Sequence, residues 1–460
     1  MQNRRRQLAG ALAALLVLAA APAADAQKPF IPPQARPTEP RWRPTDTDDP
    51  IRNAYSVPEA SKSPACTPHF CVHWVEEGLD APSLADRDGD GVPDFVARVM
   101  RVAERVHAVE NEKLGWREPR SDGRRGGRRG KTDIYLSQIG GELFGYAAPD
   151  RGQATKEHRI PRRLHGYLVL DNDYSAFEFP GTRPLEDLQV TFAHEYNHIL
   201  QFGYDAYQDP WFAEASATWM EDQVYNGIND YLRYVRRWVG LWETPLTTNS
   251  IKEYGSAVWN QWLARHYGPA VIRKAWAGAI DAKPGGFSVA SYERALRSSG
   301  PSELGRDITR FAAAVAEWRT GKGFRESYLY PDARRQGHLA LDGSELTRML
   351  NHTTFQLLRV QPRRGRALVV NVTAPLGSAA GLALVGRLGS ERHGQPRVRI
   401  AYQPEGGDLT VRLRNPGRFK RITAVVVNAD GRARGFDVGL LDWSYLTDGL
   451  PFAVSATLVE

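Results

Sequence analysis

The chain has 460 residues, of which 42% are hydrophobic and 25% charged, and its formal net charge is +7 at pH 7. This length exceeds what one ordinary hydrophobic core supports, so we expect two folded domains with additional tails. Beyond the first residues, no stretch approaches the roughly 20 apolar residues that a membrane-spanning helix needs, which excludes a transmembrane segment in the mature chain.

Residues 1–26 have the features of a secretory signal peptide. Three arginines at positions 4–6 precede an apolar run over residues 8–21, and Ala24-Asp25-Ala26 is a small-x-small cleavage site. Cleavage there lowers the formal charge to +5 and predicts a secreted or periplasmic protein, exported by the general or the twin-arginine route. Residues 27–60 are rich in proline and lack apolar periodicity, which is typical of an extended linker.

The chain contains only two cysteines, Cys66 and Cys71. An oxidising compartment favours a disulfide between them, and a free-thiol pair is the alternative. Residues 70–75 alternate like a β-strand, and we interpret His73 within this strand as a structural histidine.

Residues 86–97 form an acidic segment with four aspartates at Asp86, Asp88, Asp90 and Asp94. Carboxylates spaced in this way on a tight loop can wrap a hard cation such as Ca²⁺. Ala97 stands where an EF-hand requires its last glutamate, which excludes a complete EF-hand. A solvated acidic turn that caps the next helix, expected over residues 93–114, is the alternative.

Residues 121–131 form the most charged stretch, with four arginines, one lysine and several glycines. We interpret it as a flexible loop, and because no aromatic residue interleaves the basic ones, we expect no nucleic-acid partner. Residues 132–140 and 166–174 follow as predicted core strands.

Residues 194–198 read HEYNH within a predicted buried helix that begins near Pro184 and ends near Gly203. On an α-helix His194 and His198 lie on one face, where two imidazoles can bind one Zn²⁺ ion. Glu195 then lies beside the open coordination position, where it can accept a proton from water as a general base. The alternative is an ordinary amphipathic helix that happens to contain two histidines.

A third ligand is available on the next predicted helix, where Glu214 follows His198 by sixteen residues. This arrangement resembles the gluzincin peptidases, the thermolysin and aminopeptidase-type enzymes, in which HExxH is followed by a helix that donates a glutamate. The second motif is similar to W-x-x-E-G-x-A-x-x-x-E, here Trp211, Glu214, Ala217 and Glu221, with Ala215 in place of the glycine.

The resemblance covers most of residues 60–320 and implies an α+β, zincin-like catalytic domain, with a mixed sheet and a helical subdomain, over residues 61–335. It assigns His194, His198 and Glu214 as zinc ligands and Glu195 as the base, with Glu221 as a less well spaced alternative ligand. It also implies that the strand at residues 166–174 lines the cleft and pairs with an extended substrate.

The chain departs from the thermolysin pattern at Thr218, where that pattern has an aspartate. The carboxylate that orients a ligand histidine must then come from elsewhere, and Glu221 and Asp222 are the candidates. Helices are expected to continue to about residue 320. Within them, similarity to a helix of gluzincin-like enzymes nominates Tyr254 as a hydrogen-bond donor to the reacting carbonyl oxygen, with His266 as a lesser candidate.

Residues 353–460 contain short β-rich runs separated by Gly, Pro, Asn and Asp, which predict an all-β sandwich-like accessory domain. This domain is expected either to stabilise the enzyme or to contact a surface or polymer. The sequence as a whole therefore predicts an exported zinc metallopeptidase that acts on peptides or proteins, with the acidic loop as a candidate site for Ca²⁺. The alternatives are an extracellular adhesion or scaffold protein without activity, and a zinc hydrolase acting on another amide.

Overall fold

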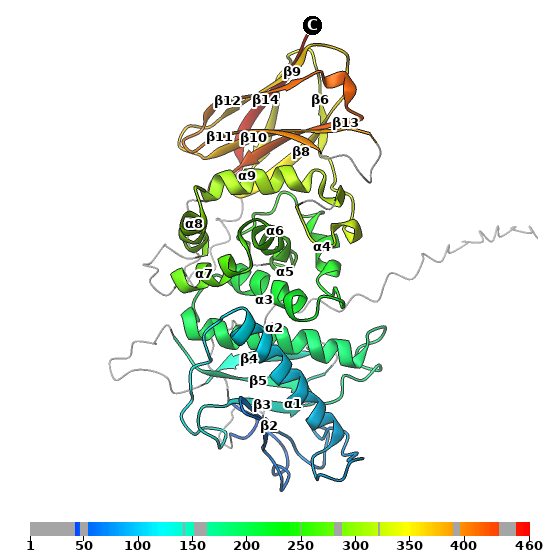
Figure 1. The fold of residues 1–460 in the computed structure, drawn as a ribbon, viewed down its shortest axis with the longest axis vertical. Coiled ribbons are helices and arrows are strands. Elements are labelled where there is room, and N and C mark those ends of the chain that lie inside the picture. Colours follow the sequence, from blue (N-terminus) through cyan, green and yellow to red (C-terminus); the bar gives the residue numbers. More distant parts are fainter. Residues whose placement is uncertain are drawn as a thin grey trace, which may run out of the picture.

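The computed structural model describes residues 42–46, 54–140, 143–150, 163–248, 250–279, 288–320, 323–389, 396–431 and 448–460. The fold belongs to the mixed α+β class, as predicted, and is elongated (Figure 1). A first sheet with its covering helices lies at one end, a layer of helices lies in the middle, and a β domain lies at the other end. The proposed signal peptide lies outside the described residues.

The first sheet has the strand order β1-β2-β3-β5-β4. Its strands are β1 (Ala65–Cys66), β2 (Phe70–His73), β3 (Thr132–Ser137), β4 (Gly145–Pro149) and β5 (Gly166–Asp171). Strands β2, β3 and β5 run parallel, whereas β4 pairs antiparallel with β5 at the edge. Every residue of β2 and β5 is buried, which accounts for their continuous apolar composition.

Two long helices pack against this sheet (Figure 1). Helix α1 (Asp94–His107) continues as a π-helical turn, η1 (Ala108–Lys113), and buries an apolar stripe of valines, as its sequence pattern predicts. Helix α2 (Pro184–Asp205) begins at the expected proline and runs two residues past Gly203. Nearly all of α2 after its first turn is buried, so its polar side chains need partners inside the protein.

The middle layer is helical and rich in aromatic residues. It comprises α3 (Pro210–Val224), α4 (Leu232–Trp238), α5 (Lys252–Gly255), α6 (Ala257–Tyr267), α7 (Ala270–Ala279), α8 (Ser288–Ser299), α9 (Leu304–Val315), η2 (Trp318–Thr320) and η3 (Ser327–Leu329). Phe212 of α3 stacks on Trp276 of α7 with 4.2 Å between ring centroids. Such contacts explain the concentration of tryptophan in this part of the sequence as packing between helices. Among the described residues no helix is long and apolar enough to cross a membrane.

The C-terminal β domain consists of two packed sheets, with the strand orders β11-β10-β13-β8-β6 and β12-β9-β14-β7. The strands are β6 (Gly337–Leu339), β7 (Leu346–Leu350), β8 (Thr354–Val360), β9 (Ala367–Ala374), β10 (Ala380–Arg387), β11 (Arg397–Gln403), β12 (Gly407–Arg414), β13 (Arg421–Asn428) and β14 (Leu450–Val459), with η4 (Pro416–Arg418) before β13. Inward-facing side chains from both sheets form one apolar core. The domain includes β6 and β7, which precede the predicted start at residue 353.

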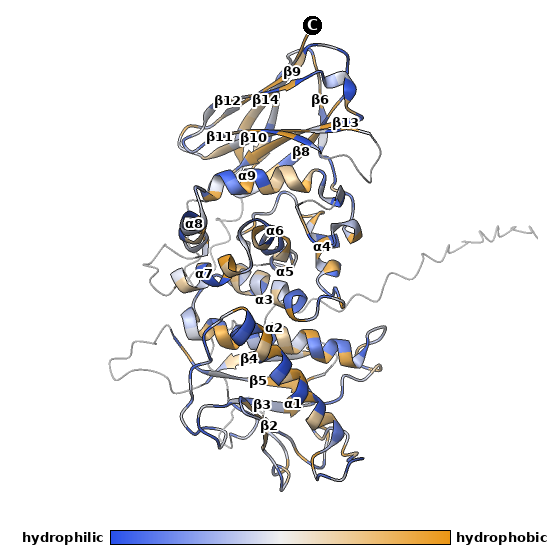
Figure 2. Cartoon of the chain, in the orientation of Figure 1, coloured by the Kyte–Doolittle hydropathy of each residue, from blue (hydrophilic) through white to orange (hydrophobic). Residues whose placement is uncertain are grey.

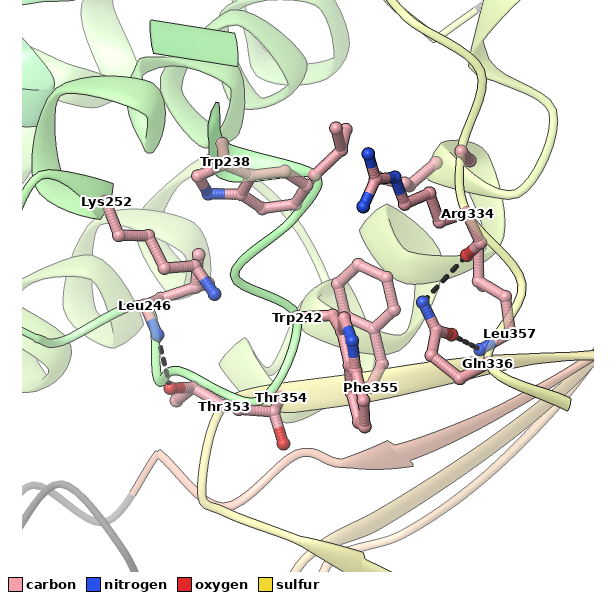
Figure 3. Close-up of a pocket in the computed structure, with 13 residues that line it drawn as sticks. Trp238, Trp242, Leu246, Lys252, Arg334, Gln336, Thr353, Thr354, Phe355 and Leu357 are labelled. Carbon is pink, nitrogen blue, oxygen red and sulfur yellow. Dashed lines mark hydrogen bonds between the residues drawn. The ribbon is translucent and has the colours of Figure 1, made fainter. Parts of the chain in front are cut away.

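The β domain is joined closely to the helical layer. Helix α9 lies against β10 and β11, and Figure 2 shows that it carries both polar and apolar residues. Glu317, which is buried, accepts hydrogen bonds from Arg421 at 2.6 Å and from Arg387 at 3.4 Å. A pocket at the junction is lined by Trp238 and Trp242 on the helical side and by residues of β8 on the other (Figure 3).

The predicted linker over residues 27–60 is not extended throughout. Arg43 is buried against the first sheet, where its guanidinium contacts Asp122 at 2.7 Å, Asp133 at 2.6 Å and also Asp150. Because these aspartates come from different segments, Arg43 fastens the start of the described chain to the sheet. The proline-rich composition concealed this anchor, since a single buried arginine adds no periodicity.

The features around β2 agree with their sequence interpretation. A disulfide joins Cys66 to Cys71 at the β1–β2 turn. His73 is buried, with Nδ1 2.6 Å from Glu59 and Nε2 3.1 Å from Asp133, so both ring nitrogens have structural partners.

Candidate metal centre

Two consecutive helices bring three potential metal ligands together. Helix α2 presents His194 and His198 on the face that meets α3, and α3 presents Glu214 toward them. The Nε2 atom of His194 lies 3.1 Å from Glu214 Oε2, and the Nε2 atom of His198 lies 3.5 Å from Glu214 Oε1. All three side chains are buried, so the cluster needs a charge-balancing arrangement.

The distances between these atoms match the donor spacing of a tetrahedral zinc site. With metal–ligand distances near 2.0–2.1 Å, two donors of a tetrahedral ion lie roughly 3.3 Å apart. The separations of 3.1 and 3.5 Å lie on either side of this value. Two imidazoles and one carboxylate also form a common donor set for catalytic zinc, which leaves a fourth position open. The residues present therefore fit a zinc ion.

The outward nitrogen of each histidine is held by a further side chain. His194 Nδ1 lies 2.7 Å from Glu221 Oε1, and His198 Nδ1 lies 2.8 Å from Gln201 Oε1. A carboxylate or amide oxygen accepts the Nδ1–H proton, which leaves the Nε2 lone pair of each ring directed at the centre. Of the two predicted orienting carboxylates, Glu221 makes this contact, whereas Asp222 accepts a hydrogen bond from Gln261 at 2.7 Å.

Sequence reasoning did not identify Gln201, whose orientation is fixed by its neighbours. Its amide nitrogen donates to Asn197 Oδ1 at 2.7 Å and to the carbonyl of Ala213 at 3.1 Å, so its oxygen faces His198. Asn197 in turn donates to Glu110 Oε2 at 2.8 Å from the π-helical turn η1. The available signal was a polar residue three positions after His198, on the same buried face of the helix.

The surroundings of the cluster favour a bound cation. Burial opposes protonation of His194, but its hydrogen bonds with Glu214 and Glu221 outweigh that effect and raise the pKa of His194 well above its usual value. Burial alone would raise the pKa of Glu214, yet the charge of His198 and the hydrogen bond with His194 lower it well below its usual value. An ionised carboxylate beside imidazoles in a low-dielectric interior attracts a metal ion for the same reason that it attracts a proton.

Glu195 follows His194 on α2 and contacts the edge of the first sheet. Its Oε2 atom accepts a hydrogen bond from the backbone N–H of Ala147 in β4 at 2.8 Å. The prediction that the strand at residues 166–174 pairs with an extended substrate is wrong, because β5 already pairs with both β3 and β4. Strand β4 is the edge strand of the sheet and lies next to α2 (Figure 1), and the backbone of its Ala147 reaches the candidate base.

Tyr254 lies beside the candidate ligands. Its ring stacks on that of His194 with 6.0 Å between centroids, and Tyr234 of α4 stacks on its other side at 5.0 Å. The adjacent Glu253 is fully buried, and burial raises its pKa well above its usual value. His266 stacks on Trp262 instead, and its Nδ1 faces the carbonyl of Trp262 at 2.8 Å.

Three further groups of potential metal ligands lie in the described part of the chain: His69 with Glu104 and His107, Asp171 with Asp173 and Glu178, and Asp86 with Asp88 and Asp90. The last is the predicted calcium loop, whose three carboxylates are exposed. Asp94 is not part of this group; it begins α1 and accepts a hydrogen bond from the backbone of Arg87 at 3.3 Å.

Comparison of the chain with models of known protein families gave no match, and comparison with curated proteins found no similar sequence.

Proposed function

We propose that this protein is an exported, gluzincin-like zinc peptidase with a zincin-like catalytic domain. The observation that carries the proposal is the convergence of His194, His198 and Glu214, with each histidine oriented by its own acceptor. The cluster differs from a structural histidine such as His73 because two imidazoles, rather than one, converge on a single carboxylate. The disulfide between Cys66 and Cys71 supports export, because such bonds persist in oxidising compartments.

The three side chains would hold zinc through the two Nε2 atoms and the Glu214 carboxylate. Zinc in such a site supplies Lewis-acid chemistry, since it polarises a substrate carbonyl and lowers the pKa of water to about 7. Glu221 and Gln201 act indirectly by keeping the Nδ1 protons in place.

Glu195 is the proposed general base. It accepts a proton from the attacking water and later delivers it to the leaving amine. The hydrogen bond from Ala147 N–H fixes one of its oxygens. Among the described residues β4 is the edge strand, and this contact brings it beside the base, where an extended peptide can add as a further strand. Tyr254 is the proposed donor to the oxyanion, a role in which one hydrogen bond contributes about 3 kcal/mol.

The decisive experiment compares Glu195→Gln with the parent chain after both have been loaded with zinc. We expect the variant to bind zinc stoichiometrically while hydrolysis of a mixed peptide library falls by at least 10³-fold, in line with loss of a general base acting on a poor nucleophile. Glu186→Gln, on the exposed first turn of the same helix, is the matched control and should retain activity.

Turnover that is unchanged in Glu195→Gln would overturn the mechanism. Stoichiometric zinc with no cleavage of any peptide by the parent chain would overturn the peptidase assignment and favour an adhesion or scaffold role. His198→Ala should lose zinc as well as activity, since it removes a ligand rather than the base.

A further inference from the structure

The loop between β5 and α2 gathers three carboxylates that have no part in the proposed reaction. Asp171 ends β5, and Asp173 and Glu178 follow it within the same loop. One oxygen from each of the three lies within 4.8 Å of the others. All three belong to one short segment, and the fold of this loop brings their carboxylates together.

The carboxylate of Asp171 is fully buried and has one oxygen without a partner. Its Oδ1 atom accepts the backbone N–H groups of Tyr174 at 2.6 Å and Asp173 at 3.1 Å, which fixes the orientation of the side chain. Its Oδ2 atom is buried and forms no hydrogen bond within the described structure. A buried carboxylate oxygen left in this state is costly unless a cation or a proton satisfies it.

The neighbouring groups increase this demand for positive charge. The pKa of Asp171 is raised to about 6, mainly by burial and further by the charges of Glu178 and Asp173, against the opposing effect of the two loop N–H groups. In the part of the chain that the structure describes, no lysine or arginine forms an ion pair with these three residues. Glu178 accepts hydrogen bonds from Ser175 Oγ at 2.9 Å and from the side chain of Gln138, which are neutral donors.

The predicted calcium loop at Asp86 differs in this respect. Its carboxylates are exposed, and Asp86 uses both oxygens to accept the backbone N–H groups of Gly89 and Gly91, each at 2.8 Å. Lys62 also reaches this loop, with Nζ 3.3 Å from the carbonyl of Asp90. These aspartates are exposed to solvent and accept hydrogen bonds from the loop backbone, whereas the Oδ2 atom of Asp171 is buried.

We propose that Asp171, Asp173 and Glu178 form a Ca²⁺ site that orders the loop leading into the helix of the metal centre. All available donors are oxygens, which suit a hard cation, and the absence of imidazole or thiolate disfavours zinc. Two stacked aromatic rings support the loop, because Phe179 packs on Phe144 with 4.1 Å between ring centroids. A cation at Asp171 therefore acts where β5 ends, and Phe179, five residues before α2 begins at Pro184, connects this loop to the helix.

The test uses the full chain, stripped of divalent ions by a chelator and then reloaded with one equivalent of zinc. Calcium binding is measured by calorimetry and by terbium luminescence, for which the buried Tyr174 in the loop is a built-in sensitiser. The variants are Asp173→Asn/Glu178→Gln and Asp86→Asn/Asp88→Asn, the latter as the matched control. Asp173→Asn alone, at an exposed position, serves if the double variant fails to fold.

We expect Ca²⁺ to raise the Tm of the parent and of the Asp86/Asp88 control, and the Asp173/Glu178 variant to bind at least tenfold more weakly with zinc content unchanged. Equal binding by the Asp173/Glu178 variant, or loss of binding only in the control, would overturn the proposal. An equal Tm shift with Mg²⁺ in the parent and in the Asp173/Glu178 variant would also overturn it, because it would indicate general screening.

Discussion

Glu221→Ala should weaken zinc binding without removing a ligand. Glu221 Oε1 lies 2.7 Å from Nδ1 of His194, and both side chains are buried, so the hydrogen bond is shielded from water. Loss of such an outer partner typically lowers metal affinity by about 10- to 100-fold, which corresponds to roughly 1.4–2.8 kcal/mol. The His194 ring would then be free to rotate or to change tautomer, and either change turns its Nε2 lone pair away from the centre.

The assay is competition for zinc with a chromophoric chelator at several pH values. Asp222→Asn is the matched control, because Asp222 is also buried on α3 but contacts Gln261 rather than a histidine. Glu221→Gln should be intermediate, since an amide oxygen can still accept the Nδ1 proton without the charge. Kinetics at saturating zinc should then show a loss in kcat smaller than that of Glu195→Gln.

Two outcomes would refute the reasoning about orientation. One is zinc affinity in Glu221→Ala within twofold of the parent value. The other is an equal loss in Asp222→Asn, which would indicate a general effect of altering α3 rather than the hydrogen bond to His194.

Two further predictions concern stability. Arg43→Ala removes the buried counter-charge of the aspartates that Arg43 contacts, and should lower the free energy of unfolding by about 3–5 kcal/mol in urea titrations. The control Arg87→Ala, at an exposed residue, should change the free energy of unfolding by less than about 0.5 kcal/mol. Burial lowers the pKa of Lys252 to about 7, so above that pH the unfolded chain binds more protons at this residue than the folded chain. Relative to Lys252→Met, the parent should therefore gain up to ~1.4 kcal/mol per pH unit between pH 7 and pH 9, and a constant difference across that range would contradict the assignment.

The meeting of His194, His198 and Glu214 could be predicted from the sequence because helical spacing determines their geometry. His194 and His198 share a helix face by periodicity, and Glu214 follows on the next helix, so their meeting required only that two consecutive helices pack together. Residues whose partners depend on strand order could not be found in this way. The contact of Glu195 with Ala147 requires β4 to lie outside β5, although β4 precedes it in the chain.

Other features escaped because their chemistry appears only after folding. Arg43 stands in a proline-rich stretch, and nothing in that stretch indicates the three aspartates with which it pairs. In the sequence, Asp171, Asp173 and Glu178 look like ordinary polar residues of a loop. The burial that distinguishes Asp171 depends on the surrounding sheet and on the stacked aromatic rings of Phe179 and Phe144.

The junction shown in Figure 3 has a consequence for processing of the chain. The backbone N–H of Leu246 donates to Thr353 Oγ1 at 3.0 Å, and the amine of Lys252, two residues before Tyr254, donates to the carbonyl of Leu241 at 2.8 Å. The β domain thus supports the segment that carries the proposed oxyanion donor. Trimming at residue 335 would remove this support and leave Glu317 without Arg387 and Arg421, so a fragment excised there should be less stable than the full chain.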